Sequence, residues 1–448
     1  MTEFENLTDF SGGRDATPPP YDVIVVGAGA AGILAAGRAA ELGGKVLLLE
    51  KMDRAGRKLL LTGKGRCNIT NTAPLDEFLK HIHPNSRFIR HAFSRFFSDD
   101  ITRLLNENGC LTVIERGGRV FPSSNRSSDV LNSLMQWMTR HPVEIRYRHK
   151  VIDLVLQDGR VAGLKIHSTR GHEMIRAKSV ILCTGGMAYP ATGSNGDGYS
   201  LAASAGHTIE TPRPALVPLE TAGDMAPRLQ GLNLKNVRAA VWIHGKKTQD
   251  AFGEMLFTEF GISGPIILTL SRLMVDALRN NARVELSIDL KPALDETKLD
   301  LRLVRDLTAN GNHRMDSICR KWLPAQMIQV FLDRTGIPAG KAGHQLTSKE
   351  RRNIVLGMKD FRFTVTGHRP FQEAIITAGG VSTAEIHPTT MESKRIPLLY
   401  FAGELVDLDA DTGGFNLQIA FSTGWLAANA CMAALTRTDR SPQLPGPI

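Results

Sequence analysis

The sixteen residues from Gly56 to Asn71, GRKLLLTGKGRCNITN, combine three glycines, four cations and one cysteine. Glycines such as Gly63 and Gly65 let a backbone approach a ligand closely, and clustered cations attract phosphate groups. The thiol of Cys67 could donate a proton there, since neighbouring charges tune its pKa. The pattern predicts a loop that meets an anion, either the phosphates of a cofactor or those of a nucleic acid. The cations that we expect to meet it are Lys58, Lys64 and Arg66.

A second glycine pattern precedes this loop. Gly27, Gly29 and Gly32 form G-x-G-x-x-G between an expected strand and an expected helix, and Glu50 ends the next strand. The first two glycines permit a tight turn against a pyrophosphate at the helix N-terminus, while the third lets helix and strand pack closely. A carboxylate at the position of Glu50 binds unphosphorylated ribose hydroxyls, so the pattern favours FAD or NAD over NADP.

The chain returns to glycines twice more, as CTGG at residues 183–186 and as AGELVDLDADTGGFNLQ at residues 402–418. A long, extended dinucleotide needs such distant contacts, so we expect FAD rather than NAD. Glu404 or Asp407 could bind its ribityl hydroxyls, although either could instead cap a helix or lie on the surface. A helix that begins near Gly414 would direct its positive end at the N1/O2 edge of a flavin and stabilise the anionic reduced form.

Hydrophobic periodicity predicts the elements that position these residues. An apolar strand at 23–26, an Ala- and Leu-rich helix to about residue 42 and a strand at 46–49 form a βαβ unit. Helices are predicted within about 75–108, in two or three pieces with Ser98 as a cap, and at 128–139.

Strands dominate the next part of the chain. They are predicted at 143–148, on both sides of a hairpin turn at Asp158-Gly159, and as two segments, EMIRA and SVILC, that return the chain to the first sheet. The middle of the chain mixes strands with helices at about 265–278, 316–333 and 348–358. It therefore reads as a domain inserted into the first one.

The resulting α/β organisation divides the chain at changes of pattern. The expected parts are a tail at 1–20, a Rossmann-type FAD-binding domain at 21–194 and 366–437, an inserted domain at 195–365 whose helical part covers about 292–358, and a tail at 438–448.

Composition limits the classes of protein that fit. The chain of 448 residues is too long for one compact core, and its 42% hydrophobic and 22% charged residues are typical of globular proteins. Its five cysteines are scattered without metal-ligand spacing, which indicates neither a zinc site nor a disulfide framework. Residues 1–20 lack signal-peptide features, and the longest nearly apolar run, 23–37, is shorter than the roughly 18 residues of a membrane span. We expect a cytoplasmic protein with no metal and no membrane segment.

The positive charge is confined to one region. Residues 51–150 hold 18 Lys and Arg against 9 Asp and Glu, an excess equal to the +9 net charge of the whole chain. Such a region can bind RNA or the phosphates of a cofactor, or it can be a solvated basic face without a partner.

Five stretches together resemble the YhiN/BaiN-type bacterial flavoproteins, also called aminoacetone-oxidase-family oxidoreductases. They are DVIVVGAGAAG, GRKLLLTGKGRCNITN, GEMLFTEFGISGP, TAGGVST and GELVDLDADTGGFNLQIAFSTG, and the resemblance covers about residues 21–435. It implies a FAD-binding fold of the glutathione-reductase superfamily, interrupted by a β-barrel-like domain with a helical part. Similar members include ribosomal RNA dihydrouridine synthases and NAD(P)H-dependent enone reductases.

The motifs and the resemblance together give a set of expected cofactor contacts. These are Gly27, Gly29, Ala30, Ala31, Gly32, Glu50, Lys51, Lys58, Gly63, Gly65, Arg66, Cys67, Asn68, Val151, Thr184, Gly185, Gly186, Gly403, Glu404, Asp407, Gly413, Gly414, Phe415, Asn416 and Leu417.

Saturation of a C=C bond needs a hydride from the flavin and a proton from a positioned acid. Cys67 is one candidate for the acid, with packing beside the flavin as its alternative role. Glu259 and His368 are weaker candidates; many relatives have His at the position of Glu259, where a carboxylate needs a raised pKa to replace it. No second G-x-G-x-x-G appears, so NADH or NADPH would have to visit the flavin transiently.

Three functions remain open on the sequence. The first is reduction of uridine to dihydrouridine in large-subunit ribosomal RNA, with the basic region 51–150 contacting the RNA. The second is NAD(P)H-dependent reduction or oxidation of a small unsaturated carbonyl or amine substrate. The third is a flavin-binding interaction protein without turnover.

Overall fold

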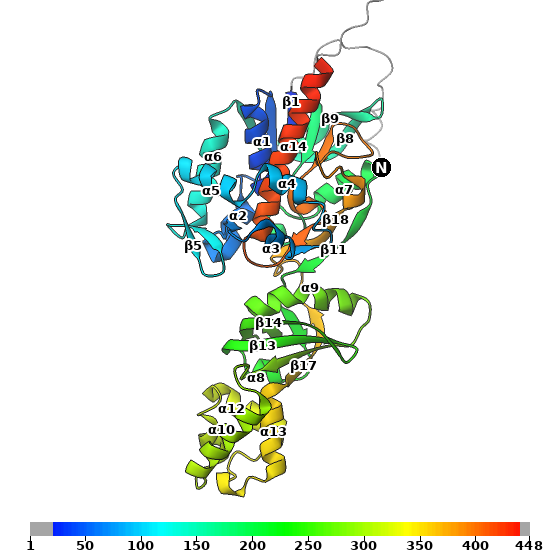
Figure 1. The fold of residues 1–448 in the computed structure, drawn as a ribbon. Coiled ribbons are helices and arrows are strands. Elements are labelled where there is room, and N and C mark those ends of the chain that lie inside the picture. Colours follow the sequence, from blue (N-terminus) through cyan, green and yellow to red (C-terminus); the bar gives the residue numbers. More distant parts are fainter. Residues whose placement is uncertain (1–20, 440–448) are drawn as a thin grey trace, which may run out of the picture.

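The computed structural model describes residues 21–439, which form three parts stacked along one long axis (Figure 1). A large α/β domain lies at one end, a β-barrel occupies the middle, and a small group of helices lies at the far end. The mixed α/β Rossmann-like fold with an inserted barrel confirms the fold predicted from the sequence.

The α/β domain is built on a parallel sheet in the order β7-β2-β1-β10-β19. Its strands are β1 (Tyr21–Val26), β2 (Val46–Glu50), β7 (Val143–Tyr147), β10 (Gly171–Leu182) and β19 (Leu399–Phe401). The sequence predicted two strands where β10 is one, because the two halves of β10 have different partners. Its first half pairs antiparallel with β9 (Arg160–Ser168) and its second half pairs parallel with β1. The loops that leave the carboxyl ends of these strands meet at one edge, where α/β sheets bind ligands.

The hairpin between β8 (Lys150–Gln157) and β9 turns where it was predicted. Asp158 and Gly159 have φ angles of 51° and 75°, which match the left-handed turn that an Asp-Gly pair favours.

Two apolar helices cover the sheet. Helix α1 (Ala30–Glu41) packs against α14 (Phe415–Asp439) and α6 (Ser127–Thr139). The stretch Phe415–Arg437 of α14 is long and apolar enough to cross a membrane, a feature that the sequence analysis overlooked. Since 61% of its most apolar window is buried inside the fold, α14 acts here as a core helix.

The predicted helical stretch after residue 75 consists of α3 (Leu75–Leu79), α4 (Arg90–Arg95) and α5 (Ser98–Glu107). The prediction that Ser98 caps α5 is wrong, because Ser98 lies inside the first turn. Instead, the Asp100 carboxylate accepts the backbone N–H of Phe97 at 2.8 Å.

The middle part is a closed barrel in the order β12-β15-β14-β13-β16-β17. Its strands are β12 (Leu219–Thr221), β13 (Asn233–Ile243), β14 (Lys246–Phe257), β15 (Gly261–Ser263), β16 (Val284–Asp289) and β17 (Phe361–His368). Helix α9 (Pro265–Arg279) lies on the barrel on the side of the α/β domain (Figure 1).

One hydrophobic core runs from the barrel into the terminal helices. These helices are α10 (Glu296–Ala309), α11 (Met315–Cys319), α12 (Ala325–Thr335) and α13 (Ser348–Lys359). The single helix predicted at 316–333 is two, since Pro324 lies between them and a proline ends or begins a helix.

Shorter elements complete the loops around the sheet edge. They are α2 (Arg57–Leu61), η2 (Thr62–Gly65), β3 (Thr70–Asn71), β4 (Ile82–His83), β5 (Thr112–Glu115), β6 (Arg119–Pro122), η3 (Pro190–Thr192), α7 (Asp197–Ser204), β11 (Ile209–Ala215), α8 (Met225–Arg228), η4 (Gly343–Gln345), β18 (Ile376–Val381), η5 (Thr383–Glu385), η6 (Gly403–Leu405) and β20 (Asp409–Ala410). Strands β11 and β18 pair with each other and carry the chain into and out of the barrel.

Candidate functional site

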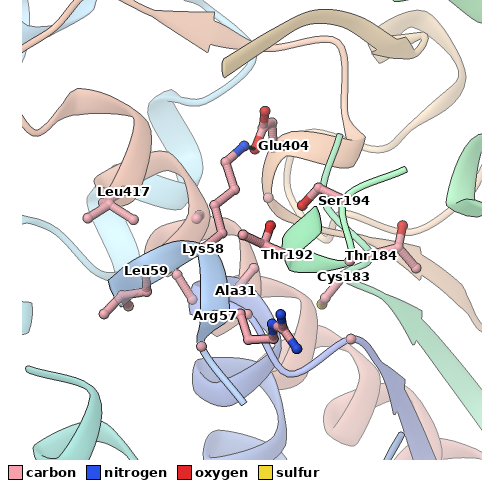
Figure 2. Close-up of a pocket in the computed structure, with 18 of the residues that line it drawn as sticks. Ala31, Arg57, Lys58, Leu59, Cys183, Thr184, Thr192, Ser194, Glu404 and Leu417 are labelled. Carbon is pink, nitrogen blue, oxygen red and sulfur yellow. Dashed lines mark hydrogen bonds and ion pairs between the residues drawn. The ribbon is translucent and has the colours of Figure 1, made fainter. Parts of the chain in front are cut away.

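A cavity of about 340 Å³ opens at the carboxyl edge of the parallel sheet. Its wall combines the loops after β1, β2 and β10 with the segment from η6 to the start of α14. Figure 2 shows side chains from these regions grouped in one place, with Lys58 reaching toward Glu404. Regions almost 400 residues apart in the sequence therefore build one site.

The first glycine loop forms the floor of the cavity. Gly27 has a φ of 98°, and a Cβ there would lie 2.6 Å from the carbonyl oxygen of Cys183. A Cβ on Gly32 would lie 1.8 Å from the Gly27 carbonyl oxygen, so Gly32 serves helix–strand packing as predicted. Gly29 lines the cavity, and a Cβ on it would meet nothing within 4 Å. The loop thus keeps open the space that a pyrophosphate occupies in such folds.

The Glu50 carboxylate is held against this loop. It accepts the N–H groups of Ala28 and Met52, each at 2.8 Å. Beside it, Lys51 Nζ lies 2.7 Å from Asp197 Oδ2 and also bonds Asn195. These contacts fix a carboxylate at the mouth of the glycine loop, in the place where a ribose would be recognised.

An ion pair joins opposite walls of the cavity (Figure 2). Lys58 Nζ, on α2, lies 2.6 Å from Glu404 Oε2, on η6. The other Glu404 oxygen accepts the backbone N–H of Thr377 at 2.8 Å. The pair links two of the predicted cofactor residues, and both side chains are about one-fifth exposed.

The start of α14 is directed into the cavity. Asn416, near its N-terminus, accepts the Ala410 N–H at 2.9 Å and donates to the Ala410 carbonyl at 2.7 Å. Gly414 packs so closely on β3 that a Cβ would lie 2.3 Å from the Thr70 carbonyl oxygen. The amide of Asn68, oriented to satisfy its neighbours, accepts the Gly414 N–H at 3.0 Å. A helix N-terminus held at a cavity wall stabilises negative charge there.

Most of the predicted cofactor residues lie on the cavity wall. They are Gly27, Gly29, Ala30, Ala31, Glu50, Lys51, Lys58, Gly63, Asn68, Val151, Thr184, Gly185, Gly403, Glu404, Gly413, Gly414, Asn416 and Leu417. Those that do not line it are Gly32, Gly65, Arg66, Cys67, Gly186, Asp407 and Phe415.

Arg66 points away from the cavity. Its guanidinium donates to Asn125 at 2.7 Å, pairs with Glu115 and lies 4.2 Å over the ring of Phe121. Arg66 therefore has its partners off the cavity wall, as does the adjoining Gly65, and its contact with the cofactor stays a prediction. Both partners of the guanidinium charge come from around strands β5 and β6, about 50 residues later in the chain.

Cys67 is fully buried and lies behind the wall rather than on it. Burial raises the pKa of its thiol to about 12, outweighing a hydrogen bond with Thr62 that lowers it. The expectation that neighbouring cations tune this thiol for proton transfer is wrong. The alternative of a packing role beside the site fits the structure.

The two weaker candidates for a proton donor are also remote. Glu259 lies exposed in the turn between β14 and β15, where Gln230 donates to it at 3.4 Å. His368 ends β17, and its Nδ1 lies 3.0 Å from the carbonyl oxygen of Arg369. Neither residue lines the cavity, and a catalytic role for either stays a prediction.

Three further residues face elsewhere. Asp407 is 9% exposed and lines a second pocket with Glu210 and Arg213, and burial raises its pKa. Phe415 stacks on His81 with ring centroids 4.4 Å apart. A Cβ on Gly186 would meet Thr377 Oγ1 at 2.4 Å, so this glycine serves close packing.

The cavity wall also holds residues that the sequence analysis did not select. Among them are Arg54, Arg57, Ser194, Leu216, Ile375, Ile376, Asp411 and Thr412. Asp411 and Thr412 directly precede the Gly413-Gly414 pair, so their place beside this glycine motif could have predicted them as cavity residues. Leu216 and Ile375 could not be predicted in this way, because the β11–β18 pairing brings them to the wall.

The comparison with protein families decides the assignment. The HI0933-like protein Rossmann domain matches residues 21–430. The chain belongs to this family. Its members include FAD-dependent oxidoreductases, and the resemblance inferred from the sequence motifs is confirmed.

Two similar curated proteins match over nearly their whole length. A 3-dehydro-bile acid delta(4,6)-reductase of Clostridium scindens is 30% identical over 408 residues, which covers 91% of this chain and 98% of the relative. A ribosomal RNA dihydrouridine synthase of Escherichia coli is 28% identical over 418 residues, covering 92% and 98%. Among solved structures, the Mycobacterium smegmatis Sdh1 complex shares the fold with a TM-score of 0.51 and 17% identity, covering 94% of this chain and 69% of that one.

The cavity fits the cofactor of a FAD flavoprotein. The open cradle at Gly29, the carboxylate of Glu50 fixed beside it and the N-terminus of α14 provide donors and acceptors for a pyrophosphate, a ribose and an anionic ring edge. Gly29 and Glu50 belong to one βαβ unit, whereas α14 comes from the far end of this HI0933-like chain, so the site has the span that an extended dinucleotide requires.

Proposed function

We propose that this chain reduces a C=C bond conjugated to a carbonyl group, with uridine of large-subunit ribosomal RNA as its principal substrate and dihydrouridine as the product. The names of both curated relatives describe reactions of this type, one on a bile acid and one on uridine. Reduction of such a bond adds a hydride to the carbon remote from the carbonyl and a proton to its neighbour. This shared chemistry is the observation that carries the proposal.

FAD supplies the hydride when it is bound in its reduced form. The chain's own part is to bind and orient. The N–H groups around Gly29 would hold the pyrophosphate, Glu50 would hold the adenosine ribose, and Lys58 would meet a phosphate. The N-terminus of α14 stabilises negative charge, and the apolar side chains of Leu216 and Ile375 exclude water from the reacting end. NADH or NADPH is the proposed transient reductant.

Exposed cations beside the cavity support RNA as the substrate. Lys64 directly follows the cavity residue Gly63, and Arg116, Arg119 and Arg126 lie exposed on and around β5 and β6. Within residues 21–439, Lys64 and Arg116 take part in none of the ion pairs. Unpaired cations of this kind bind phosphates and position a single strand so that one base can leave its stack. A role on ribosomal RNA implies a cytoplasmic protein.

A small conjugated carbonyl compound is the second candidate. It is favoured by the bile acid reductase, which is as similar to this chain as the RNA enzyme is. The apolar wall of Leu216, Ile375, Ile376 and Leu408 suits a hydrocarbon skeleton. Under this candidate, the exposed cations near β5 are a solvated face.

The test is deletion of the gene followed by mass mapping of dihydrouridine in large-subunit ribosomal RNA. We expect one uridine position to lose its 2 Da increment and to regain it when the wild-type gene is restored. A Lys64→Glu/Arg116→Glu variant should restore it poorly, whereas Arg140→Glu, at the other end of α6, should restore it fully. If every dihydrouridine survives the deletion, RNA is not the substrate. A screen for anaerobic NADH or NADPH oxidation with 3-oxo-Δ4,6 bile acids then tests the second candidate, and lack of turnover leaves a flavin-binding protein without catalysis.

A further inference from the structure

Two histidines and an aspartate meet where β4 pairs with β20, beside the cavity. The Asp411 carboxylate is the centre of this group. One of its oxygens lies 2.8 Å from His81 Nδ1 and the other 3.5 Å from His83 Nε2. Asp411 belongs to the cavity wall, whereas both histidine side chains are 34% exposed. The group therefore connects the cavity with solvent.

Several contacts fix the geometry of this group. Strand pairing sets Asp409 opposite His83, and the Asp411 N–H donates to the His81 carbonyl at 3.0 Å. The His81 ring stacks on Phe415 at 4.4 Å with an interplanar angle of 18°. Asn416 donates to the Asp411 carbonyl at 3.2 Å and thereby ties the group to the start of α14. The carboxylate and the imidazole are thus held in register with the helix end that faces the cavity.

The electrostatic surroundings keep Asp411 ionised. Burial alone would raise its pKa, but the hydrogen bonds and positive charge of His81 and His83 outweigh burial and hold the pKa below its usual value. The other charged groups at this place are Asp409, whose pKa burial raises to about 6, and Arg272 of α9, whose Nε lies 2.7 Å from an Asp409 oxygen. Arg213 of β11 lies next to them and also acts on Asp409.

We propose that Asp411, His81 and His83 form the path by which protons from solvent reach the substrate during the reduction proposed above, on which this inference rests. Hydride addition from bound, reduced FAD would leave oxidised FAD and an enolate-type anion of the substrate. The ionised Asp411 carboxylate takes a proton from the His81 imidazolium along their hydrogen bond and passes it to the carbon next to the carbonyl, which forms the new C–H bond and leaves Asp411 ionised again. The neutral His81 then regains a proton from solvent, with His83 beside it. Imidazoles suit this role because their pKa lies near neutral pH.

Asp411 is the catalytic residue in this scheme, and His81 is a positioning residue that acts through it. The variants Asp411→Asn and His81→Gln keep the size of the side chains and remove the proton path. A matched control is Asp76→Asn on α3, a carboxylate that is 85% exposed in the same region of the chain. Each variant is first shown to bind FAD and to unfold at the wild-type temperature.

The kinetic arm separates the two half-reactions by anaerobic stopped flow with the FAD-loaded protein. Reduction of the flavin by NADH or NADPH should stay within about twofold of wild type in all variants. Reoxidation by unmodified large-subunit ribosomal RNA, or by a 3-oxo-Δ4,6 bile acid if the RNA is inert, should slow about 100-fold in Asp411→Asn and His81→Gln only. Reoxidation of both variants within threefold of wild type would overturn the proposal.

The second arm does not depend on turnover. In protein labelled with ¹³C at the aspartate carboxyl carbon, the Asp411 resonance is assigned by its absence from Asp411→Asn. His81→Gln should raise the pKa of Asp411, because burial then acts with less opposition from positive charge. If the pKa of Asp411 is the same in His81→Gln as in wild type, the two residues are not coupled and the proposal is overturned. This result can be obtained without turnover. If the wild-type protein reduces neither the RNA nor the bile acid, that separate result contradicts the proposed function. If Asp411→Asn does not fold, His81→Gln carries the kinetic arm, where reoxidation within threefold of wild type would still overturn the proposal.

Discussion

Two glycines of one motif should fail in different ways when each is replaced by alanine. Gly32→Ala places a methyl group 1.8 Å from the Gly27 carbonyl oxygen, a contact between backbone and side chain that no rotamer can relieve. Gly29→Ala places its methyl group on the cavity wall with nothing within 4 Å. The first substitution should therefore damage folding, and the second should damage cofactor binding.

The magnitudes follow from the local geometry. Overpacking of a buried site costs about 1–3 kcal/mol, and the very short contact at Gly32 belongs at the upper end of this range. The better helix propensity of alanine offsets at most about 1 kcal/mol. Gly32→Ala should therefore lower the free energy of unfolding by about 2 kcal/mol. Gly29 is the N-cap of α1, where alanine is a poorer cap than glycine, so its loss of stability should stay below about 1 kcal/mol. The methyl group of Gly29→Ala should displace at least one charge-assisted hydrogen bond to the pyrophosphate. Loss of one such bond costs about 1.5–3 kcal/mol of binding free energy, which raises the Kd for FAD roughly tenfold to hundredfold.

Urea unfolding of the apoproteins and titration of flavin fluorescence measure these two quantities separately. The reasoning would be refuted by a Gly29→Ala protein with wild-type FAD affinity together with a Gly32→Ala apoprotein that unfolds at the wild-type midpoint. Gly43→Ala provides a control outside the motif, since a Cβ there also meets nothing within 4 Å and Gly43 does not line the cavity, although its φ of 89° adds strain.

Three other predictions follow from side chains of the site. Cys67, whose pKa is about 12, should resist alkylation by iodoacetamide at pH 8 in the folded protein, and rapid labelling would contradict its burial. The Cys67→Ala variant should still bind FAD and turn over. Lys58→Met removes the partner of Glu404 and should weaken FAD binding about tenfold. It should also make the Kd for FAD less dependent on salt concentration, whereas the exposed control Lys80→Met should not. The same salt dependence in Lys58→Met and wild type would exclude a contact between Lys58 and a phosphate. Because the pKa of Asp409 is raised to about 6 in the folded state, its contribution to stability should fall as pH rises from about 4 to 6, and urea unfolding of Asp409→Asn should lack that slope.

Local pattern was sufficient to predict the first βαβ unit. The strand at Tyr21–Val26, the helix Ala30–Glu41 and the strand Val46–Glu50 each follow from a few neighbouring residues, as does the close approach at Gly32. The cavity-lining glycines at Gly185 and Gly413 were predictable for the same reason, since strand, glycine turn and helix are consecutive in the chain.

Side chains whose direction depends on distant partners were predicted poorly. Arg66 adjoins the correct loop, yet Glu115 and Phe121 attract its charge away from the cavity. Asp407 was chosen for its place in an acidic, glycine-rich run, but the strand geometry turns it to a second pocket, whereas Asp411 of the same run lies on the cavity wall. Closure of the barrel depends on pairing of β12 with β17, in which Leu219 lies opposite His368, and no local period encodes a pairing over such a distance in the sequence.

The most direct test of the proposed reaction is a single turnover with purified protein. The FAD-loaded enzyme is reduced without oxygen and mixed with an unmodified transcript of large-subunit ribosomal RNA, while the flavin absorption near 450 nm is followed and the RNA is mapped by mass. We expect the flavin band to return as one uridine gains 2 Da, and we expect Gly29→Ala to be inactive at limiting FAD. A flavin that stays reduced in the presence of the RNA, and is reoxidised by a conjugated bile acid instead, would contradict RNA as the substrate.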